Sequence, residues 1–192
     1  MNRLAVFASG TGSNFQAIVD AIEDGVLDAQ VCILVCDKPN ARVVERALAH
    51  QIPTFVFQPK SYQSKMAFET EICKQLRKLE VDWIILAGYM RLIGETLLSA
   101  YEGRIINIHP SLLPNFPGKD AIGQALAADA VTTGVTIHYV DEGMDTGPII
   151  AQQAVSIEKD DTHDSLQKKI QQVEHQLYIE TISNLVTGAI KR

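Results

Sequence analysis

The stretch RLAVFASGTGSNFQAIVDAIEDG, residues 3–25, contains the signals of a strand, a turn and a helix in succession. Its first residues form a short apolar run of the kind that predicts a buried strand. Gly10 and Gly12 follow at once, and apolar residues at helical spacing then continue to Gly25, a residue type that commonly ends helices. A strand that passes through a glycine turn into a helix is the first half of a βα unit, the building block of parallel sheets.

The rest of the chain repeats this alternation and then changes near its C-terminus. Apolar runs and amphipathic stretches predict strands at 30–37, 53–57, 82–88 and 104–109, with helices at 41–50, 61–79 and 94–101. Two strands at 133–140 and 147–157 follow one another without a helix between them, and a long helix at 162–187 ends before Gly188. We therefore predict an α/β fold: a mainly parallel, twisted, Rossmann-like sheet with helices on both faces and an antiparallel extension at one side.

The composition is that of a globular protein with a sizeable core. The 192 residues are 46% hydrophobic and 21% charged, with a formal net charge of -6. No repeat or linker divides the chain, so we expect residues 1–192 to form a single domain. Binding to a nucleic-acid backbone needs clustered Lys and Arg, so the acidic balance predicts no nucleic-acid partner.

The apolar runs and the cysteines bear on location. No run approaches the ~18 residues of a membrane helix, and the N-terminal run is shorter than the roughly 7–15 residues of a signal peptide's apolar region. Three cysteines, Cys32, Cys36 and Cys73, without a CxxC pair indicate reduced thiols rather than disulfides or a metal site. We expect a cytoplasmic protein with no metal and no membrane partner.

The turn SGTGSN, residues 9–14, lies beyond the carboxyl end of a strand, where open α/β sheets bind ligands. A helix that opens at Ser13 and Asn14 presents free backbone N–H groups that can bind a phosphate. The structural alternative is a tight turn with Ser or Asn as the helix N-cap. A dinucleotide site needs a third glycine where this chain has Phe15, although Asp37 partly imitates the acid that binds the ribose.

A second unusual stretch is INIHPSLLPNFPG, residues 106–118. Strand periodicity puts Asn107 and His109 on the same face, directly before a proline-rich loop. The structural interpretation is a turn-forming Asn and a His satisfied at the rim of the core. The catalytic interpretation draws on the loop, which is apolar enough to cover a ligand at the edge where function usually lies.

Two further sets of charged residues complete this edge. The loop 141–147 has three carboxylates in a spacing that does not fit an EF-hand, and it follows the strand of His138, which points either into the cleft or into the core. It is either a solvated acidic turn or the source of a carboxylate beside His109 that orients the imidazole proton. Glu174 falls between two apolar arcs of the last helix, as a buried charge or a helix-edge Glu.

Together these motifs resemble one family. SGTGSN, LAGYMRL, NIHPSLLPNFPG and DEGMDTGP are similar to the folate-dependent formyltransferases, and the similarity extends to QVEHQLY in the last helix. The Gly-Ser-Asn turn narrows the resemblance to the branch that acts on glycinamide ribonucleotide (GAR) in purine synthesis. The resemblance implies transfer of a formyl group from 10-formyltetrahydrofolate to the GAR amine, with no metal.

The resemblance also implies roles for particular residues. Asn107 and His109 would stabilise the oxyanion, and Asp145 would assist proton transfer, with His138 as a possible additional member. The phosphate would bind Gly12, Ser13 and Asn14, and the ribose would bind Glu174. The folate pocket would contain Lys65, Met90, Arg91, Leu92, Ile93, Val140 and Asp141. Lys65 stands where other members can carry an Arg, and Asp120 and Ile122 stand where others can carry histidines, so that part of the loop transfers no role.

Other activities remain open on sequence grounds. A deformylase would hand the formyl group to water, and a methionyl-tRNA formyltransferase would act on RNA, but both normally carry an extra domain that this sequence lacks. A nucleotide-binding oxidoreductase is disfavoured by Phe15, and a non-catalytic nucleotide-binding module would leave the predicted catalytic residues without a shared purpose. The expected partners are GAR and the folate, and the chain is expected to be a monomer or a homodimer.

Overall fold

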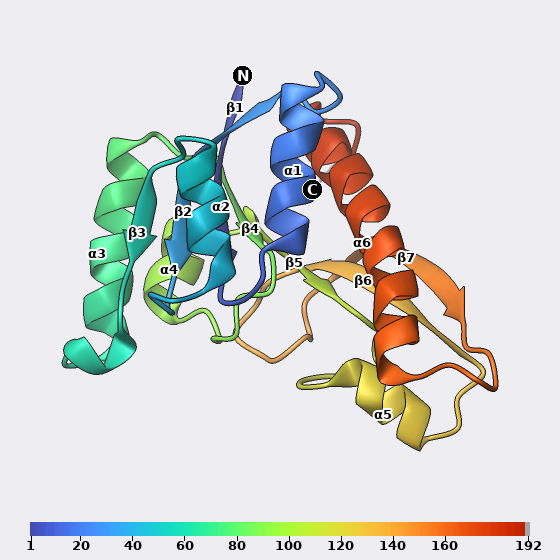
Figure 1. Cartoon of the computed structure of the whole chain (residues 1–192). Helices are drawn as coiled ribbons and strands as arrows, with labels where there is room; N and C mark the ends of the chain where they lie inside the picture. The colour runs from blue at the N-terminus through green and yellow to red at the C-terminus, as the bar shows by residue number, and fades with distance from the viewer. Residues whose placement is uncertain (191–192) are drawn as a thin grey trace.

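A computed structural model describes residues 1–190 and contains one seven-stranded sheet in the order β3-β2-β1-β4-β5-β6-β7 (Figure 1). The strands are β1 (Asn2–Ala8), β2 (Ala29–Cys36), β3 (Thr54–Val56), β4 (Trp83–Leu86), β5 (Ile105–His109), β6 (Thr132–Tyr139) and β7 (Ile149–Ser156). The pairs from β3 to β5 are parallel, whereas β5–β6 and β6–β7 are antiparallel. The predicted fold class, including the antiparallel extension, is confirmed.

Helices cover both faces of the sheet. They are α1 (Ser13–Glu23), α2 (Arg42–Ala49), α3 (Lys65–Lys78), α4 (Glu95–Ala100), α5 (Ala121–Ala127) and α6 (His163–Val186), with a short 3-10 turn η1 (Pro59–Ser61). Buried residues of α1, α2 and α6 join one apolar cluster, and those of α3 and α4 join a second cluster on the opposite face. The sheet is therefore the middle layer of three.

β1 shows why its sequence is an uninterrupted apolar run. Leu4 and Val6 belong to the cluster under α1 and α6, whereas Ala5 and Phe7 belong to the cluster under α3 and α4. All four side chains are fully buried. Because successive strand residues point to opposite faces, a strand covered on both sides needs an apolar residue at every position.

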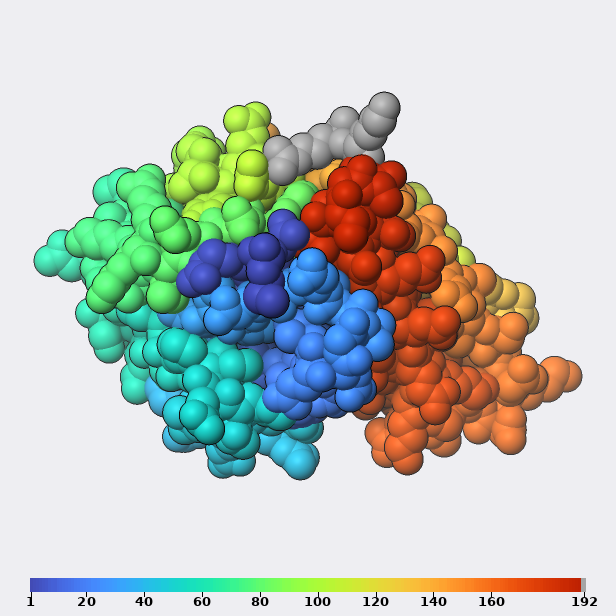
Figure 2. All heavy atoms as spheres, turned by 90° about the horizontal axis from the view of Figure 1, so that it is seen from above, coloured from blue at the N-terminus to red at the C-terminus, as the bar shows by residue number. Residues whose placement is uncertain are grey.

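The N-terminal strand and helix lie beside the C-terminal helix α6. Seen from above, the N-terminal residues and α1 (blue) lie against α6 (red), as Figure 2 shows. Asn2 Nδ2 donates a hydrogen bond to the Val186 carbonyl at 3.1 Å. Further along α6, the Tyr178 hydroxyl donates to the Leu86 carbonyl at 2.7 Å. These contacts fix α6 across the centre of the sheet, which places Glu174 near the carboxyl ends of the strands.

The structure differs from the sequence prediction in the start of one helix and in the presence of another. The helix predicted at 61–79 begins at Lys65, because the Ser64 side chain caps it by accepting from Ala67 N at 3.1 Å. The helix α5 was not predicted at all, and it begins after Asp120, whose side chain accepts from Gly123 N at 3.1 Å. The last helix follows the prediction closely, with Thr162 as its N-cap.

The cysteines agree with the sequence prediction. All three are free and buried, and burial raises the pKa of each thiol above its ordinary value. Within residues 1–190, no helix combines the length and the apolar character needed to cross a bilayer.

Candidate active site

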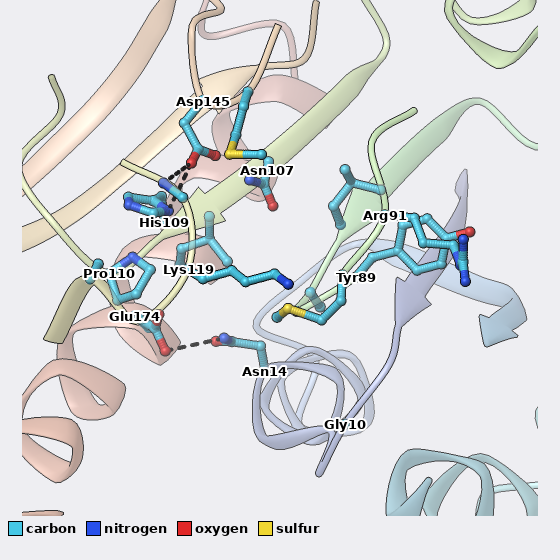
Figure 3. Close-up of a pocket in the computed structure, with 18 of the residues that line it drawn as sticks. Gly10, Asn14, Tyr89, Arg91, Asn107, His109, Pro110, Lys119, Asp145 and Glu174 are labelled. Atoms are coloured by element: carbon cyan, nitrogen blue, oxygen red, sulfur yellow. Dashed lines mark hydrogen bonds and ion pairs between the residues drawn. The ribbon is translucent and has the colours of Figure 1, made fainter. Parts of the chain in front are cut away.

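A cavity of about 490 Å³ lies at the carboxyl ends of the parallel strands (Figure 3). Its walls come from loops that follow β1, β4, β5 and β6, and from one side of α6: residues 10–14, 86–93, 107–110, 118–122, 138, 140, 141, 143–145, 163, 167 and 174. The cavity brings together every residue predicted for the site except Lys65. Two loops are named below by their residues: the post-β4 loop is 87–94, and the flap is 110–120.

His109 lies between two acceptors at one end of the cavity. Its Nδ1 is 3.4 Å from Asp145 Oδ2, and its Nε2 is 2.8 Å from the carbonyl oxygen of Phe116 in the flap. A carbonyl oxygen can only accept, so Nε2 carries a proton. Because Nδ1 faces a carboxylate, the doubly protonated imidazolium is the form that satisfies both contacts.

Asn107 and His138 occupy the neighbouring positions of β5 and β6 and are register partners. The ring nitrogen Nδ1 of His138 donates to the Tyr139 carbonyl at 2.8 Å. Its Nε2 lies 3.4 Å from Asn107 Nδ2 and 3.7 Å from Asp145 Oδ1. Without a proton, Nε2 accepts from the Asn107 amide; with one, it faces the Asp145 carboxylate. His138 is buried yet lines the cavity, and it orients the Asn107 amide.

Asp145 connects the two histidines to the flap. Besides its contacts with both rings, its Oδ2 accepts from the Gly118 N–H at 2.8 Å. Burial raises the pKa of the Asp145 carboxyl, but the His138 ring, the Gly118 N–H and the charge of His109 together outweigh burial. The net pKa therefore lies below the ordinary value, and the group is a carboxylate at neutral pH.

The other acids of the same loop have different surroundings. Asp141 Oδ1 accepts from Gly143 N at 3.0 Å and from Thr146 Oγ1 at 2.7 Å, so this carboxylate shapes the turn. Glu142 is exposed and does not line the cavity. Both predicted interpretations of the loop therefore apply in part. Asp141 and Glu142 belong to an acidic turn, whereas Asp145 places its carboxylate beside the two histidines.

The turn before α1 is built around Gly12. Gly12 has φ +77° and is the N-cap of α1, with no side-chain capping bond. The predicted alternative, a Ser or Asn N-cap, is therefore wrong, because the glycine occupies that position. A Cβ on Gly12 would lie 2.6 Å from Val43 Cγ2, and the Thr11 carbonyl accepts from Arg46 Nε at 2.8 Å. The turn is rigid, and it leaves the N-terminal end of α1 open towards the cavity.

Glu174 faces this turn from α6. Its Oε2 accepts from Asn14 Nδ2 at 3.3 Å, across the lower part of the cavity in Figure 3. Burial raises the pKa of Glu174 to about 7, and the hydrogen bond from Asn14 only partly offsets this. The helix-edge interpretation of Glu174 is therefore excluded, because the carboxyl group is buried at the wall of the cavity.

The post-β4 loop forms the opposite wall. Met90 and Leu92 are 65% and 46% exposed, whereas Ile93 is buried. The Arg91 side chain is engaged within the protein, because its Nε donates to Asp37 Oδ2 at 2.8 Å. The loop thus offers apolar side chains and backbone groups to the cavity, and the Arg91 charge is used to hold the loop. Val140 and Asp141 continue this wall beyond β6.

Lys65 and Glu69 hold the far end of that loop from α3. Lys65 Nζ donates to the Leu92 carbonyl at 2.8 Å, and Gly94 N donates to Glu69 Oε1 at 2.7 Å. Glu69 is 2% exposed, and burial raises the pKa of its carboxyl. The sequence analysis missed Glu69 because one charged position on an amphipathic helix carries no signal of burial. It also missed Ser9, whose Oγ accepts from Met90 N at 3.0 Å.

The hydrogen bonds of Asp37 argue against a dinucleotide site. Its two carboxylate oxygens are bonded to Ser9 Oγ at 2.5 Å and to Arg91 Nε at 2.8 Å. The side chain is buried in this network. An acid that binds a ribose needs an oxygen free towards the ligand, and Asp37 has both oxygens engaged within the protein.

Fold and cavity together define an open α/β enzyme with a His–Asp pair and a helix N-terminus at the carboxyl edge of its sheet. A model of the formyl transferase family matches residues 2–182, and the chain belongs to this family. The resemblance seen in the four motifs is thereby confirmed.

Individual relatives are similar over nearly the whole chain. The phosphoribosylglycinamide formyltransferase of Bacillus subtilis (strain 168) is 58% identical over 97% of this chain and 95% of that protein. Glycinamide ribonucleotide transformylase 1 from Geobacillus kaustophilus is 63% identical, with a TM-score of 0.94 over 96% of this chain and 98% of that one. Phosphoribosylglycinamide formyltransferase from Bacillus halodurans is 57% identical, with a TM-score of 0.95 over 98% and 97%.

Proposed function

We propose that the chain transfers the formyl group of 10-formyltetrahydrofolate to the amine of GAR, as a phosphoribosylglycinamide formyltransferase of purine synthesis. One observation carries this proposal: a single cavity joins the open N-terminus of α1 to the group formed by Asn107, His109 and Asp145. A substrate with a phosphate at one end and an amine at the other fits that layout. Relatives that carry this activity in their names support the same substrate.

The chemistry assigned to the three residues follows from their hydrogen-bonding capacity. Bound 10-formyltetrahydrofolate supplies the formyl carbon. As the GAR amine bonds to that carbon, negative charge grows on the formyl oxygen. The Asn107 amide and the charged His109 ring are the two donors for it, and one such donor typically contributes about 10²–10³ in rate. The bond from the carbon to N10 of the folate then breaks.

Protons must also move for the reaction to balance. The attacking amine loses a proton and N10 gains one. Asp145, a carboxylate with a lowered pKa, keeps His109 charged and accepts the amine proton, directly or through water. His109 or that water returns a proton to N10. General acid–base assistance of this type is typically worth about 10²–10⁴ in rate.

The two ligands divide the cavity between them. Gly12, Ser13 and Asn14 bind the GAR phosphate through backbone N–H groups, and Glu174 accepts from the ribose hydroxyls. The folate lies against Met90, Leu92, Ile93, Val140 and the backbone of Arg91 and Asp141. The exposed apolar side chains of Met90 and Leu92 are suited to a flat aromatic ring system.

Organisation and location are part of the same proposal. One sheet runs through the whole fold, and the family model matches residues 2–182, which supports a single formyltransferase domain over 1–192. The cavity is lined by residues of one chain, so a monomer or a homodimer can work. The net charge of -6 disfavours nucleic acid, and three free, buried thiols fit a reducing, cytoplasmic location. Within residues 1–190, no group of His, Cys, Asp and Glu is arranged to hold a metal.

The test compares two acceptors with one donor. The chain is mixed with 10-formyltetrahydrofolate in the presence of GAR and in its absence, and the release of tetrahydrofolate is followed by absorbance. We expect release that depends on GAR and a formylated GAR product by mass spectrometry. Release in water alone would identify a deformylase instead, and no release in either mixture would contradict the proposal.

A further inference from the structure

Lys119 lies at the end of the flap and lines the cavity, and it has no part in the mechanism above. Figure 3 shows its side chain extending across the cavity, with the ammonium group above Asn14 in this view. Its backbone oxygen accepts from Gln124 Nε2 at 2.8 Å. Within the part of the chain that the structure describes, its ammonium group has no hydrogen-bond or ion-pair partner.

The other basic side chains along the cavity wall are already engaged. Arg91 is paired with Asp37 at 2.8 Å, and His163 with Asp120 at 2.9 Å. His109 faces Asp145. Among the described residues that line the cavity, Lys119 is thus the one Lys or Arg whose charge is free for a ligand.

The phosphate end of the cavity needs such a charge. A phosphate monoester carries about -1.5 to -2 at neutral pH, and this protein has a formal net charge of -6. The turn at Gly12 offers backbone N–H groups alone, and the Glu174 carboxyl lies directly beside it. Backbone dipoles attract an anion, but a nearby cation balances its charge as well.

The backbone around Lys119 is fixed while its side chain is free. The preceding residue, Gly118, donates to Asp145 at 2.8 Å. The following residue, Asp120, has φ +52°, caps α5 and is paired with His163. The base of the Lys119 side chain is therefore anchored beside the His109–Asp145 pair, and its four-carbon stem extends into the cavity that the α1 turn also lines.

We propose that the ammonium group of Lys119 binds the substrate phosphate from the side opposite the N-terminus of α1. This inference rests on the proposed function, because it assigns a residue to the phosphate of GAR. It also makes the flap part of the substrate site: an occupied phosphate site holds Lys119, and through Gly118 the same segment contacts Asp145.

The test uses Lys119→Met, which keeps the stem and removes the charge, and Lys119→Arg, which keeps the charge. Lys78→Met is the matched control, because Lys78 is an exposed lysine at the end of α3, outside the cavity. We expect Lys119→Met to raise the KM for GAR about tenfold, as loss of one charge-assisted contact predicts. Its kcat and its KM for the folate should change less than about twofold, and Lys119→Arg should recover most of the loss.

A second substrate tests the assignment to the phosphate itself. Glycinamide riboside, which lacks the phosphate, should be used equally by wild type and Lys119→Met. Added salt should raise the KM for GAR more steeply in wild type than in Lys119→Met, because one charge contact is screened. Titration calorimetry with GAR alone gives a binding constant that does not depend on turnover and should show the same tenfold loss.

Three results would overturn the assignment while formyl transfer by wild type persists. The first is an unchanged KM for GAR in Lys119→Met. The second is a rise in the folate KM instead, which would place the ammonium on the folate carboxylates. The third is an equal loss with the phosphate-free riboside. If wild type itself transfers no formyl group to GAR, the proposed function fails, whatever Lys119 does.

Discussion

Two loops line the same cavity, and they are fixed by different kinds of group. The post-β4 loop, 87–94, is held by side chains outside the predicted catalytic set: Ser9, Asp37, Lys65 and Glu69. The flap, 110–120, is held in its first half by the buried hydroxyl of Thr136. In its second half it is held by His109 and Asp145 themselves, which contact Phe116 and Gly118.

The two loops are expected to respond differently when substrates bind. The supports of the post-β4 loop lie outside the proposed catalytic group, so this loop can be held in place before any ligand arrives. If His109 and Asp145 act on the substrates as proposed, the second half of the flap competes with the substrates for their hydrogen bonds. The proposal therefore couples the position of the flap, but not the anchoring of the post-β4 loop, to substrate binding.

Asp145→Asn is expected to have the largest effect on catalysis of the substitutions described here. The amide keeps an oxygen for the Gly118 N–H but loses the negative charge that faces His109 Nδ1 at 3.4 Å. We expect kcat to fall by about 10³, a loss typical of general acid–base groups. The KM for the folate should change little, because its wall is built from the other loop. Steady-state kinetics with both substrates measures this.

The control for this change is Glu142→Gln, three residues earlier in the same loop. Glu142 is exposed and does not line the cavity, so the same loss of one negative charge should leave kcat within about twofold. A kcat for Asp145→Asn equal to that of Glu142→Gln would remove Asp145 from the chemistry.

Thr136→Val tests the first half of the flap and should act mainly on stability. The fully buried Thr136 hydroxyl donates to the Ser111 carbonyl at 2.7 Å and accepts from Leu113 N at 3.0 Å. The hydroxyl also accepts from Gln152 Nε2 at 2.8 Å, and Gln152 keeps its bond to the Leu113 carbonyl without it. Valine has the same shape but leaves the Ser111 carbonyl and Leu113 N without this partner, which costs about 2–3 kcal/mol of unfolding free energy. Urea unfolding measures this loss, and a loss below about 0.5 kcal/mol would show that the flap is not anchored here.

The positions of most strands and helices could be predicted from the sequence, whereas the geometry of the site could not. Strand and helix positions were predictable because the apolar spacing of each element matches its own period, as in Leu4 to Phe7. Asn107 and His109 could be placed at the ligand-binding edge because β5 ends there. Asp145 could not be placed by this rule, because β6 runs antiparallel to β5, and only the family resemblance pointed to it. The distances between these residues could not be predicted, since they depend on the register between β5 and β6.

The supports of the post-β4 loop were invisible for a different reason. Glu69 and Ser9 lie far from that loop along the chain, and nothing in their local sequence distinguishes them from ordinary polar residues. Helix α5 was missed because it is short, contains Gly123 and follows a proline-rich segment, so no helical period stands out. Gly12 occupies the expected N-cap position because its backbone is left-handed and because a Cβ there would lie 2.6 Å from Val43 Cγ2.

Glu69→Gln tests the post-β4 loop through the pH dependence of stability. Burial raises the pKa of Glu69 in the folded protein above 4.5, its ordinary value. The folded state then holds this proton more tightly than the unfolded state, so the contribution of Glu69 to stability falls as pH rises from 4.5 through the raised pKa. Glutamine keeps an oxygen for Gly94 N and does not ionise. We expect this part of the pH dependence to disappear.

Unfolding free energies of wild type and Glu69→Gln, measured at several values between about pH 5 and about pH 7.5, give the comparison. The wild type should lose more stability than the variant over this range, because only the wild type has a carboxyl group that must ionise while buried. The matched control is Glu71→Gln, on the same helix at a more exposed position beside Lys74, which should keep the slope of wild type. If the unfolding free energy of Glu69→Gln changed with pH as steeply as that of wild type, the Glu69 carboxyl would be hydrated in the folded protein.

Lys65→Met is expected to have the smallest effect, and it separates two roles of one residue. In the structure Lys65 is exposed, lies outside the cavity wall and donates to the Leu92 carbonyl. An exposed hydrogen bond of this type contributes about 0.5 kcal/mol, so the KM for the folate should rise about twofold, with the KM for GAR unchanged. Lys65→Arg should restore the KM for the folate, because arginine also donates to a carbonyl.

The family resemblance instead puts Lys65 in the folate pocket. Loss of a direct charge contact with the folate would raise the KM for the folate about tenfold, and Lys65 would then make the wild-type KM steeply dependent on salt. A twofold rise in the KM for the folate therefore means that Lys65 supports the loop. A tenfold rise means that Lys65 binds the folate directly, and the post-β4 loop is then held partly by a residue of the site itself.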